Sequence, residues 1–128
     1  MKLDVLALLA ALVSHDSLGA SATALASELA NRLGCERVSI GFVEDRFTRV
    51  VAISHGAIST NTSEMLRVIG AAMDESIEQA ATVVAPAPED HVPRIVLAHE
   101  ELLRHDGGMA ITIPLVVAHQ LVGAVLCQ

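Results

Sequence analysis

The first part of the chain changes from helical to strand spacing of its apolar residues. From Ser21 to Leu33, apolar residues recur every three or four positions, and Gly34 follows as a helix-ending residue, so this segment is predicted to be an amphipathic helix. Residues 37–43 alternate apolar with small or polar side chains. A polar turn then leads into the apolar run 47–54, and together these segments predict a β-hairpin.

The middle of the chain has a second helical pattern. Its apolar residues are spaced three and four positions apart, at Leu66, Ile69, Met73 and Ile77. A short β-branched run at 82–84 predicts a strand that ends before the following prolines. Because proline fixes φ at a value that suits the first turn of a helix, Pro93 predicts the start of a further helix that extends to His105.

Two apolar segments close the sequence, at 109–117 and 121–127, and the short connection between them predicts a second hairpin. Both segments are apolar on both faces. A sheet built on such strands carries helices on one face and a helix or a ligand on the other. Because hairpins stand at both ends of the β content, the sheet is predicted to be antiparallel and the fold class to be α+β.

The N-terminal run from Val5 to Val13 is almost entirely apolar. It is too short to span a bilayer, and Lys2 beside Asp4 is a poor start for a signal peptide. We therefore expect a helix that is apolar around most of its circumference. Such a helix needs a partner surface, which predicts a homodimer through residues 1–20 with the interface at Leu6, Leu9 and Val13.

Composition narrows the possible partners. The 128 residues fit one domain, the net charge is −7, and only 2% of the residues are aromatic. An acidic chain repels a phosphate backbone, so nucleic acid is excluded as an expected partner. Cys35 and Cys127 stand far apart in the sequence without metal-ligand spacing, which predicts neither a disulfide framework nor a structural zinc site and indicates the cytoplasm.

Motifs for catalysis are missing from the sequence. The six histidines show no metal-binding spacing, and no glycine-rich phosphate loop, GxSxG turn or cysteine–histidine nucleophile pair is present. We therefore expect no bound metal and no enzymatic activity. The carboxylates of Asp74, Glu75 and Glu78 follow Met73 and are expected on the solvent side of their helix.

Several segments carry a resemblance to a known family. ANRLGCERVSIGFVEDRFTRVVAISHGA and the closing MAITIPLVVAHQLVGAVLCQ resemble the GAF domain, a relative of PAS. IGAAMDESIEQAATVV and RIVLAHEELLRH look like the GAF domain of bacterial chains that continue into a HlyD-type membrane-fusion segment. The resemblance implies one domain over 1–128, excised from a longer chain, with a dimerisation helix at 1–20 and the GAF core at 21–128.

The resemblance also implies a GAF/PAS-like central antiparallel sheet with helices on both faces and a ligand pocket on one of them. His55 ends a strand where such a pocket opens, and Ser39, Ser54 and Thr112 are polar interruptions of apolar strands, so these four are the candidate ligand-binding residues. Each could instead bond to a neighbouring backbone group. Arg94 and His99 could close the pocket but are expected to face solvent.

Departures from the family limit what the pocket could bind. The sequence lacks the cyclic-nucleotide signature, a pocket cysteine for a bilin, and the several loop cysteines of methionine-sulfoxide-reducing relatives. The ligand is therefore unidentified. The resemblance also implies that the first and last strands are neighbours, which would bring Cys35 near Cys127 as two inert thiols. The first hypothesis is a sensory or regulatory domain, and the alternative is a structural dimerisation scaffold with a collapsed pocket.

Overall fold

The computed structural model describes residues 18–54, 62–90 and 92–128. Its element order is α2 (Leu18–Leu33), β1 (Val38–Glu44), β2 (Phe47–Ile53), α3 (Thr62–Gln79), β3 (Val83–Ala85), α4 (Leu97–Asp106), β4 (Ala110–Val117) and β5 (Gln120–Cys127). The expected sequence of helices and strands is confirmed over these residues. The expected dimerisation helix at 1–20 lies almost wholly outside them.

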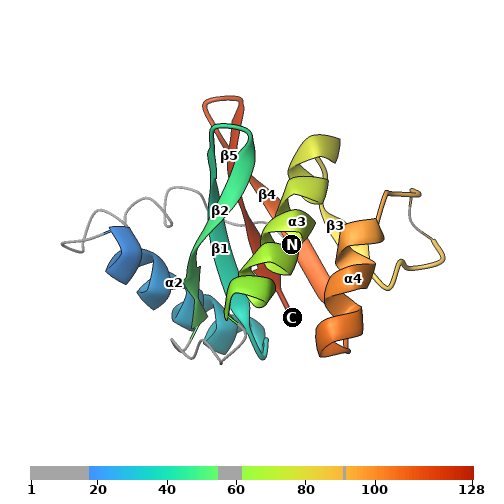
Figure 1. Ribbon diagram of the computed structural model, residues 1–128, viewed down its shortest axis with the longest axis horizontal. Helices are drawn as coiled ribbons and strands as arrows, with labels where there is room; N and C mark the ends of the chain where they lie inside the picture. The colour runs from blue at the N-terminus through green and yellow to red at the C-terminus, as the bar shows by residue number, and fades with distance from the viewer. Residues whose placement is uncertain (1–17, 55–61, 91) are drawn as a thin grey trace.

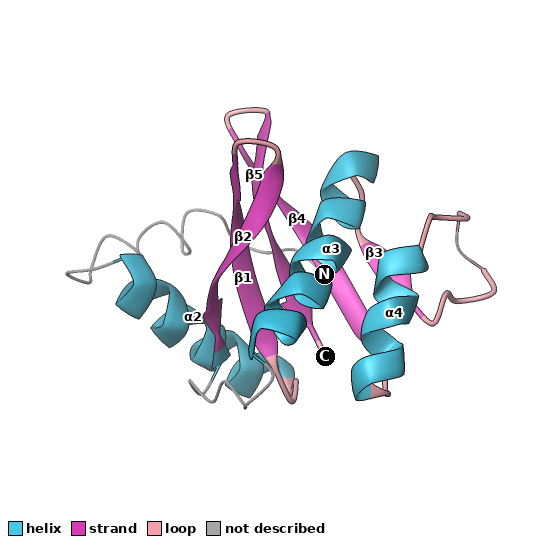
Figure 2. Cartoon of the chain, in the orientation of Figure 1, coloured by secondary structure: helices cyan, strands magenta, loops and turns pink. Residues whose placement is uncertain are grey.

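The strands form one antiparallel sheet in the order β2-β1-β5-β4-β3. β5 is therefore central and pairs with β1, so the first and last strands are neighbours as expected. Figures 1 and 2 show α2 on one face of the sheet, and α3 and α4 on the opposite face. The α+β class and the helices on both faces are confirmed.

Two apolar clusters separate these layers. The first, between α2 and the sheet, is built from the alanines Ala22, Ala26 and Ala30 of α2 packed against strand residues such as Val38 and Val125. Small side chains let the helix lie close to the sheet. The second cluster lies between α3, α4 and the other face, where Val68, Ile69, Ala72, Met73 and Leu102 pack against Ala124 and Leu126.

The ends of two elements follow local chemistry. Gly34, with φ +68°, ends α2, and the N–H of Cys35 donates to the carbonyl of Ala30 at 3.0 Å, as in a Schellman cap. The predicted helix start at Pro93 is wrong. Residues 92–96 are not helical, and α4 begins at Leu97. The start of α4 is set by a carboxylate of α3 that accepts hydrogen bonds from its first N–H groups, and not by the fixed φ of Pro93.

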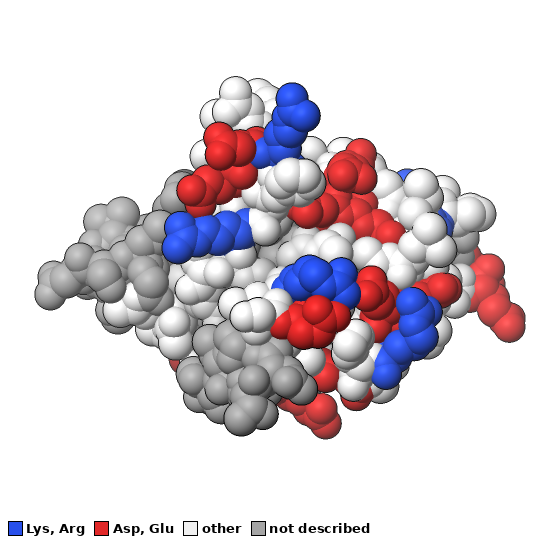
Figure 3. Space-filling view, in the orientation of Figure 1, with Lys and Arg blue, Asp and Glu red and all other residues white. Residues whose placement is uncertain are grey.

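The outward surfaces of α3 and α4 carry charges of both signs. Figure 3 shows acidic and basic side chains interspersed on this face. Within the described part of the chain, no helix is long and apolar enough to cross a membrane.

Candidate functional site

Ser39 and Thr112, two of the expected pocket residues, lie in one row across the sheet. Each pairs with Leu126 of the central strand, Ser39 from β1 and Thr112 from β4. Both side chains are fully buried on the face that α3 covers. Among the described residues, the hydroxyl of Ser39 has no hydrogen-bond partner. The structure thus places both hydroxyls within packed core.

Ser54, the third expected ligand-binding residue that the structure describes, has a different role. Ser54 is buried, and its Oγ accepts a hydrogen bond of 2.9 Å from the N–H of Val38, which ties the end of β2 to the start of β1. This is the backbone role that the sequence left open. His55 lies outside the described residues, as do Leu6, Leu9 and Val13.

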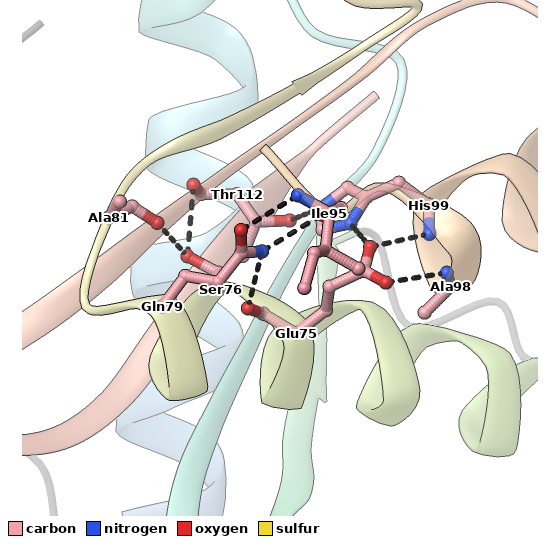
Figure 4. Close-up of polar contacts among 8 residues, drawn as sticks. All are labelled: Glu75, Ser76, Gln79, Ala81, Ile95, Ala98, His99 and Thr112. Atoms are coloured by element: carbon pink, nitrogen blue, oxygen red, sulfur yellow. Dashed lines mark hydrogen bonds and ion pairs between the residues drawn. The ribbon is translucent and has the colours of Figure 1, made fainter. Parts of the chain in front are cut away.

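His99 is one of two polar residues whose burial the sequence analysis did not predict. It was expected to face solvent, but its side chain is 0% exposed. Nδ1 lies 2.7 Å from Oε1 of Glu75 on α3, and Nε2 lies 2.7 Å from Oγ1 of Thr112 on β4. Figure 4 shows this imidazole between the two partners. The histidine is buried because both of its ring nitrogens are bonded there.

Glu75 is likewise buried, contrary to the solvent-facing position expected for it. Its carboxylate accepts hydrogen bonds from the backbone N–H of Ala98 at 2.8 Å and of His99 at 3.2 Å, in the first turn of α4. Amide groups there lack intrahelical partners and favour negative charge. Glu75 therefore caps α4 from a neighbouring helix, which compensates the cost of burying its charge.

The hydrogen bonds fix the protonation of His99. Since the Glu75 carboxylate can only accept, Nδ1 carries the proton, and Nε2 accepts from the hydroxyl of Thr112. Burial lowers the pKa of His99, and this effect outweighs the opposite influence of the hydrogen bond to Glu75. The imidazole is therefore held neutral inside the domain.

A carboxylate, an imidazole and a hydroxyl in a chain resemble a nucleophilic relay. A nucleophile, however, must reach its substrate, and the Thr112 side chain is fully buried. The chain instead joins three elements, α3 through Glu75, α4 through His99 and β4 through Thr112. We assign it the role of a clamp that holds α4 against the sheet.

Two further side chains of α3 extend this clamp. The Ser76 hydroxyl donates to the carbonyl of Ala81 at 2.5 Å. The Gln79 amide accepts from the N–H of Ile95 at 2.7 Å and donates to the carbonyl of the same residue at 2.8 Å. Figure 4 shows Gln79 and Ile95 beside the Glu75 contacts. The segment before α4 is thus tied to α3 at Ile95.

A cavity of about 390 Å³ lies at the outer edge of the sheet, between β3 and the segment that leads to α4. It is lined by Thr82, Val84, Ala87, Pro88, Glu89, Val92, Pro93, Arg94 and Val96. The lining is mainly apolar, and Arg94 and Glu89 are its charged members. Of the expected ligand-binding residues, Ser39, Ser54 and Thr112 do not line it.

The two cysteines are neighbours, as expected from the strand order. β1 and β5 pair so that Val38 lies opposite Cys127, and Cys35 packs against the same apolar cluster as Cys127. Burial and the adjacent Cys35 thiol raise the pKa of Cys127 to about 12. A thiol held in its protonated form is a poor nucleophile.

Glu64, Glu101 and His105 form a possible metal-ligand group on the surface of α3 and α4. The Arg67 guanidinium bonds to both carboxylates, at 2.6 Å to Glu64 and 2.7 Å to Glu101. Its hydrogen bond also lowers the pKa of Glu64. The carboxylates thus already have a cationic partner, and the cluster is an ion-pair network between the two helices.

Comparison with known proteins gives a fold without a family assignment. No protein-family model and no curated protein matches the sequence. Among solved structures, the GAF domain of a phosphoenolpyruvate-protein phosphotransferase from Coxiella burnetii is similar, with 15% identity and a TM-score of 0.59 over 97% of this chain and 74% of that one.

Two other similar structures have different roles. The phycocyanobilin-bound GAF domain of a cyanobacterial phytochrome has 17% identity and a TM-score of 0.59, over 99% of this chain and 80% of that one. Free methionine-R-sulfoxide reductase from Neisseria meningitidis has 14% identity and a TM-score of 0.55, over 99% and 76%. The chain therefore has the fold of GAF domains, and this fold supports both sensing and catalysis.

Proposed function

We propose that this chain is a non-catalytic regulatory domain that binds a small molecule and pairs with a second copy inside a larger bacterial signalling or secretion protein of the cytoplasm. The cavity at the β3 edge carries the proposal. Its volume of about 390 Å³ lies within the range of small-molecule pockets, and its lining is mostly apolar with a few polar groups.

The cavity lies next to α4, and the far end of α4 is bonded to residues at the ends of β1 and β5. Val96, on its wall, directly precedes α4, whose C-terminal Asp106 contacts Arg37 at the start of β1 and accepts a hydrogen bond of 2.9 Å from the side chain of Gln128. Arg37 also donates to Gln128 at 2.6 Å. A ligand that contacts Val96 would alter the packing of α4 and thereby that of Gln128, the residue that follows β5.

The absence of catalysis is part of the same proposal. The hydroxyl, imidazole and carboxylate of the clamp satisfy one another in the core, and the raised pKa of Cys127 opposes thiolate chemistry at the cysteine pair. Because the free methionine-R-sulfoxide reductase has a similar fold, the lack of catalytic activity needs an experimental test. Loss of a measured activity in the Cys35→Ser/Cys127→Ser variant would overturn it.

The sheet face that α3 covers is packed with buried side chains. This packing favours a second function, a dimerisation scaffold whose GAF pocket has collapsed. Ser39 and Thr112 are enclosed there, and a Cβ added at Gly41 would come within 2.6 Å of the Met73 sulfur. In that case residues 1–20, with Leu6, Leu9 and Val13, carry the function by pairing two copies. The HlyD-type parent chain is a refinement of either proposal and rests on the sequence motifs alone.

Thermal unfolding across a metabolite panel distinguishes the two functions, because a ligand that binds only the folded state raises its stability. The regulatory function predicts at least one compound that raises the melting temperature of the unmodified chain. The same compound should not raise that of a Val84→Trp variant, whose indole would occupy part of the cavity. Leu6→Glu/Leu9→Glu is the matched test of the scaffold and should give a folded monomer. A panel without any stabilising compound contradicts ligand binding.

A further inference from the structure

Arg94 and Glu89 are opposite charges on the wall of a mainly apolar cavity. Among the described residues, neither makes an ion pair or a hydrogen bond with the other or with a third group. Unpaired charges facing the same cavity are available to a ligand. The remaining lining gives an apolar surface, chiefly Val84, Val92 and Val96.

The wall that carries Arg94 is held in place. The neighbouring Ile95 is bonded through both its N–H and its carbonyl to the side chain of Gln79. Pro88 and Pro93 restrict the backbone of the same segment. A fixed wall loses little conformational freedom on binding, so it favours recognition of a small ligand.

An added peptide strand is the alternative occupant of this edge. β3, however, is only 3 residues long and is followed by Pro86 and Pro88, which lack the N–H that a strand ladder needs. Val92 is exposed and could contact a peptide side chain of any size, so it would not select one peptide over another. The short edge strand and the two prolines that follow it favour a small molecule over a peptide.

We infer that the cavity at the β3 edge binds a small zwitterion with an apolar body, chemically an aliphatic α-amino acid. Its carboxylate pairs with Arg94, its ammonium group pairs with Glu89, and its side chain lies against Val84, Val92 and Val96. A ligand with only a negative charge would lie beside the Glu89 carboxylate without a compensating cation. The net charge of −7 on the chain would also repel such an anion. The zwitterion matches both wall charges. This inference rests on the proposed regulatory function.

Leucine and two analogues test the inference. 4-Methylpentanoate lacks the ammonium group of leucine, and isoamylamine lacks its carboxylate. Calorimetric titration of the unmodified chain should show saturable leucine binding, with each analogue at least 10-fold weaker. Arg94→Ala and Glu89→Gln should each weaken leucine binding at least 10-fold. Arg46→Ala and Glu36→Gln, which change exposed charges elsewhere, should not.

The possible results separate the inference from the function on which it rests. Analogues that bind as well as leucine, or an Arg94→Ala variant with unchanged affinity, overturn the zwitterion. Suppose that leucine, valine and methionine all fail to bind, but a nucleotide or another metabolite stabilises the unmodified chain and not the Val84→Trp variant. The zwitterion inference is then wrong, and the regulatory function stands. If no compound binds, both are contradicted.

Discussion

The Nε2 atom of His99 lies 2.7 Å from Oγ1 of Thr112, so a helix on the surface is bonded to a strand inside the sheet. Removing the hydroxyl would leave this nitrogen buried without a donor, which costs about 1–3 kcal/mol. We predict that Thr112→Val lowers the free energy of unfolding by that amount in urea.

Thr48 provides the matched control for this substitution. It is also a buried strand threonine, but among the described residues its hydroxyl has no hydrogen-bond partner. The same change, Thr48→Val, should therefore alter stability by less than about 0.5 kcal/mol or raise it. Equal losses in the two variants would show that the His99 bond contributes nothing specific.

Glu75 is predicted to stabilise the start of α4. In Glu75→Gln, the side-chain amide would place a donor among N–H groups that now donate to a carboxylate. We expect a loss of about 2–4 kcal/mol in unfolding free energy. Glu78→Gln, an exposed change on the same helix, should stay within about 0.5 kcal/mol. A Glu75→Gln variant as stable as the unmodified chain would contradict the cap.

The lowered pKa of His99 predicts a pH dependence. The unfolded chain takes up a proton as the pH falls through about 6.5, while the folded chain keeps His99 neutral to lower pH. The unfolded state then binds more protons, so stability should fall as the pH drops below about 6.5, until the folded pKa is passed.

Titration of the imidazole proton by NMR measures this directly. The folded His99 signal should titrate below 6.5. A His99→Gln variant should lose part of the stability slope, whereas His119→Asn should keep it. A folded His99 that titrates above 6.5 would show that the hydrogen bond to Glu75 outweighs burial.

The β4–β5 turn contains two residues with positive φ, Ala118 at +50° and His119 at +66°. This backbone region is unfavourable for a side chain with a Cβ. Ala118→Gly should therefore raise the unfolding free energy by about 0.5–1 kcal/mol. The same change at exposed Ala24, within α2, should lower it by about 1 kcal/mol. A loss in both variants would contradict the turn geometry.

The cysteine pair should remain reduced under mild oxidation. The pKa of Cys127 is raised to about 12 by burial and by Cys35, so it forms little thiolate at neutral pH. Mass spectrometry after brief exposure to dilute hydrogen peroxide should find no bond between the two sulfurs. Rapid disulfide formation together with a change in oligomeric state would instead support a redox role.

Sequence periodicity predicted the helices because the apolar stripe of each faces one cluster, and it predicted the central strand because its alternate residues face both clusters. Leu66, Ile69 and Met73 all belong to the cluster beneath α3. The N-terminus of α4 was misplaced because its cap comes from Glu75, which is distant in the sequence.

The buried clamp had a sequence signal that could have been used. Glu75 lies seven residues after Val68 and three after Ala72, so it falls on the apolar face of its helix rather than on the solvent side. His99 stands three residues before Leu102 and shares its face. The pairing of these two polar residues could not be predicted, because it depends on how α3 and α4 pack.

The regulatory site at the β3 edge is the central claim, and amide hydrogen exchange tests it most directly. Exchange is compared with and without the metabolite that gives the largest thermal shift. The account predicts slower exchange at 82–90 and 92–96, and a change along α4 that extends to Asp106. Protection confined to the hairpin of β1 and β2, or no protection in these segments, would contradict it.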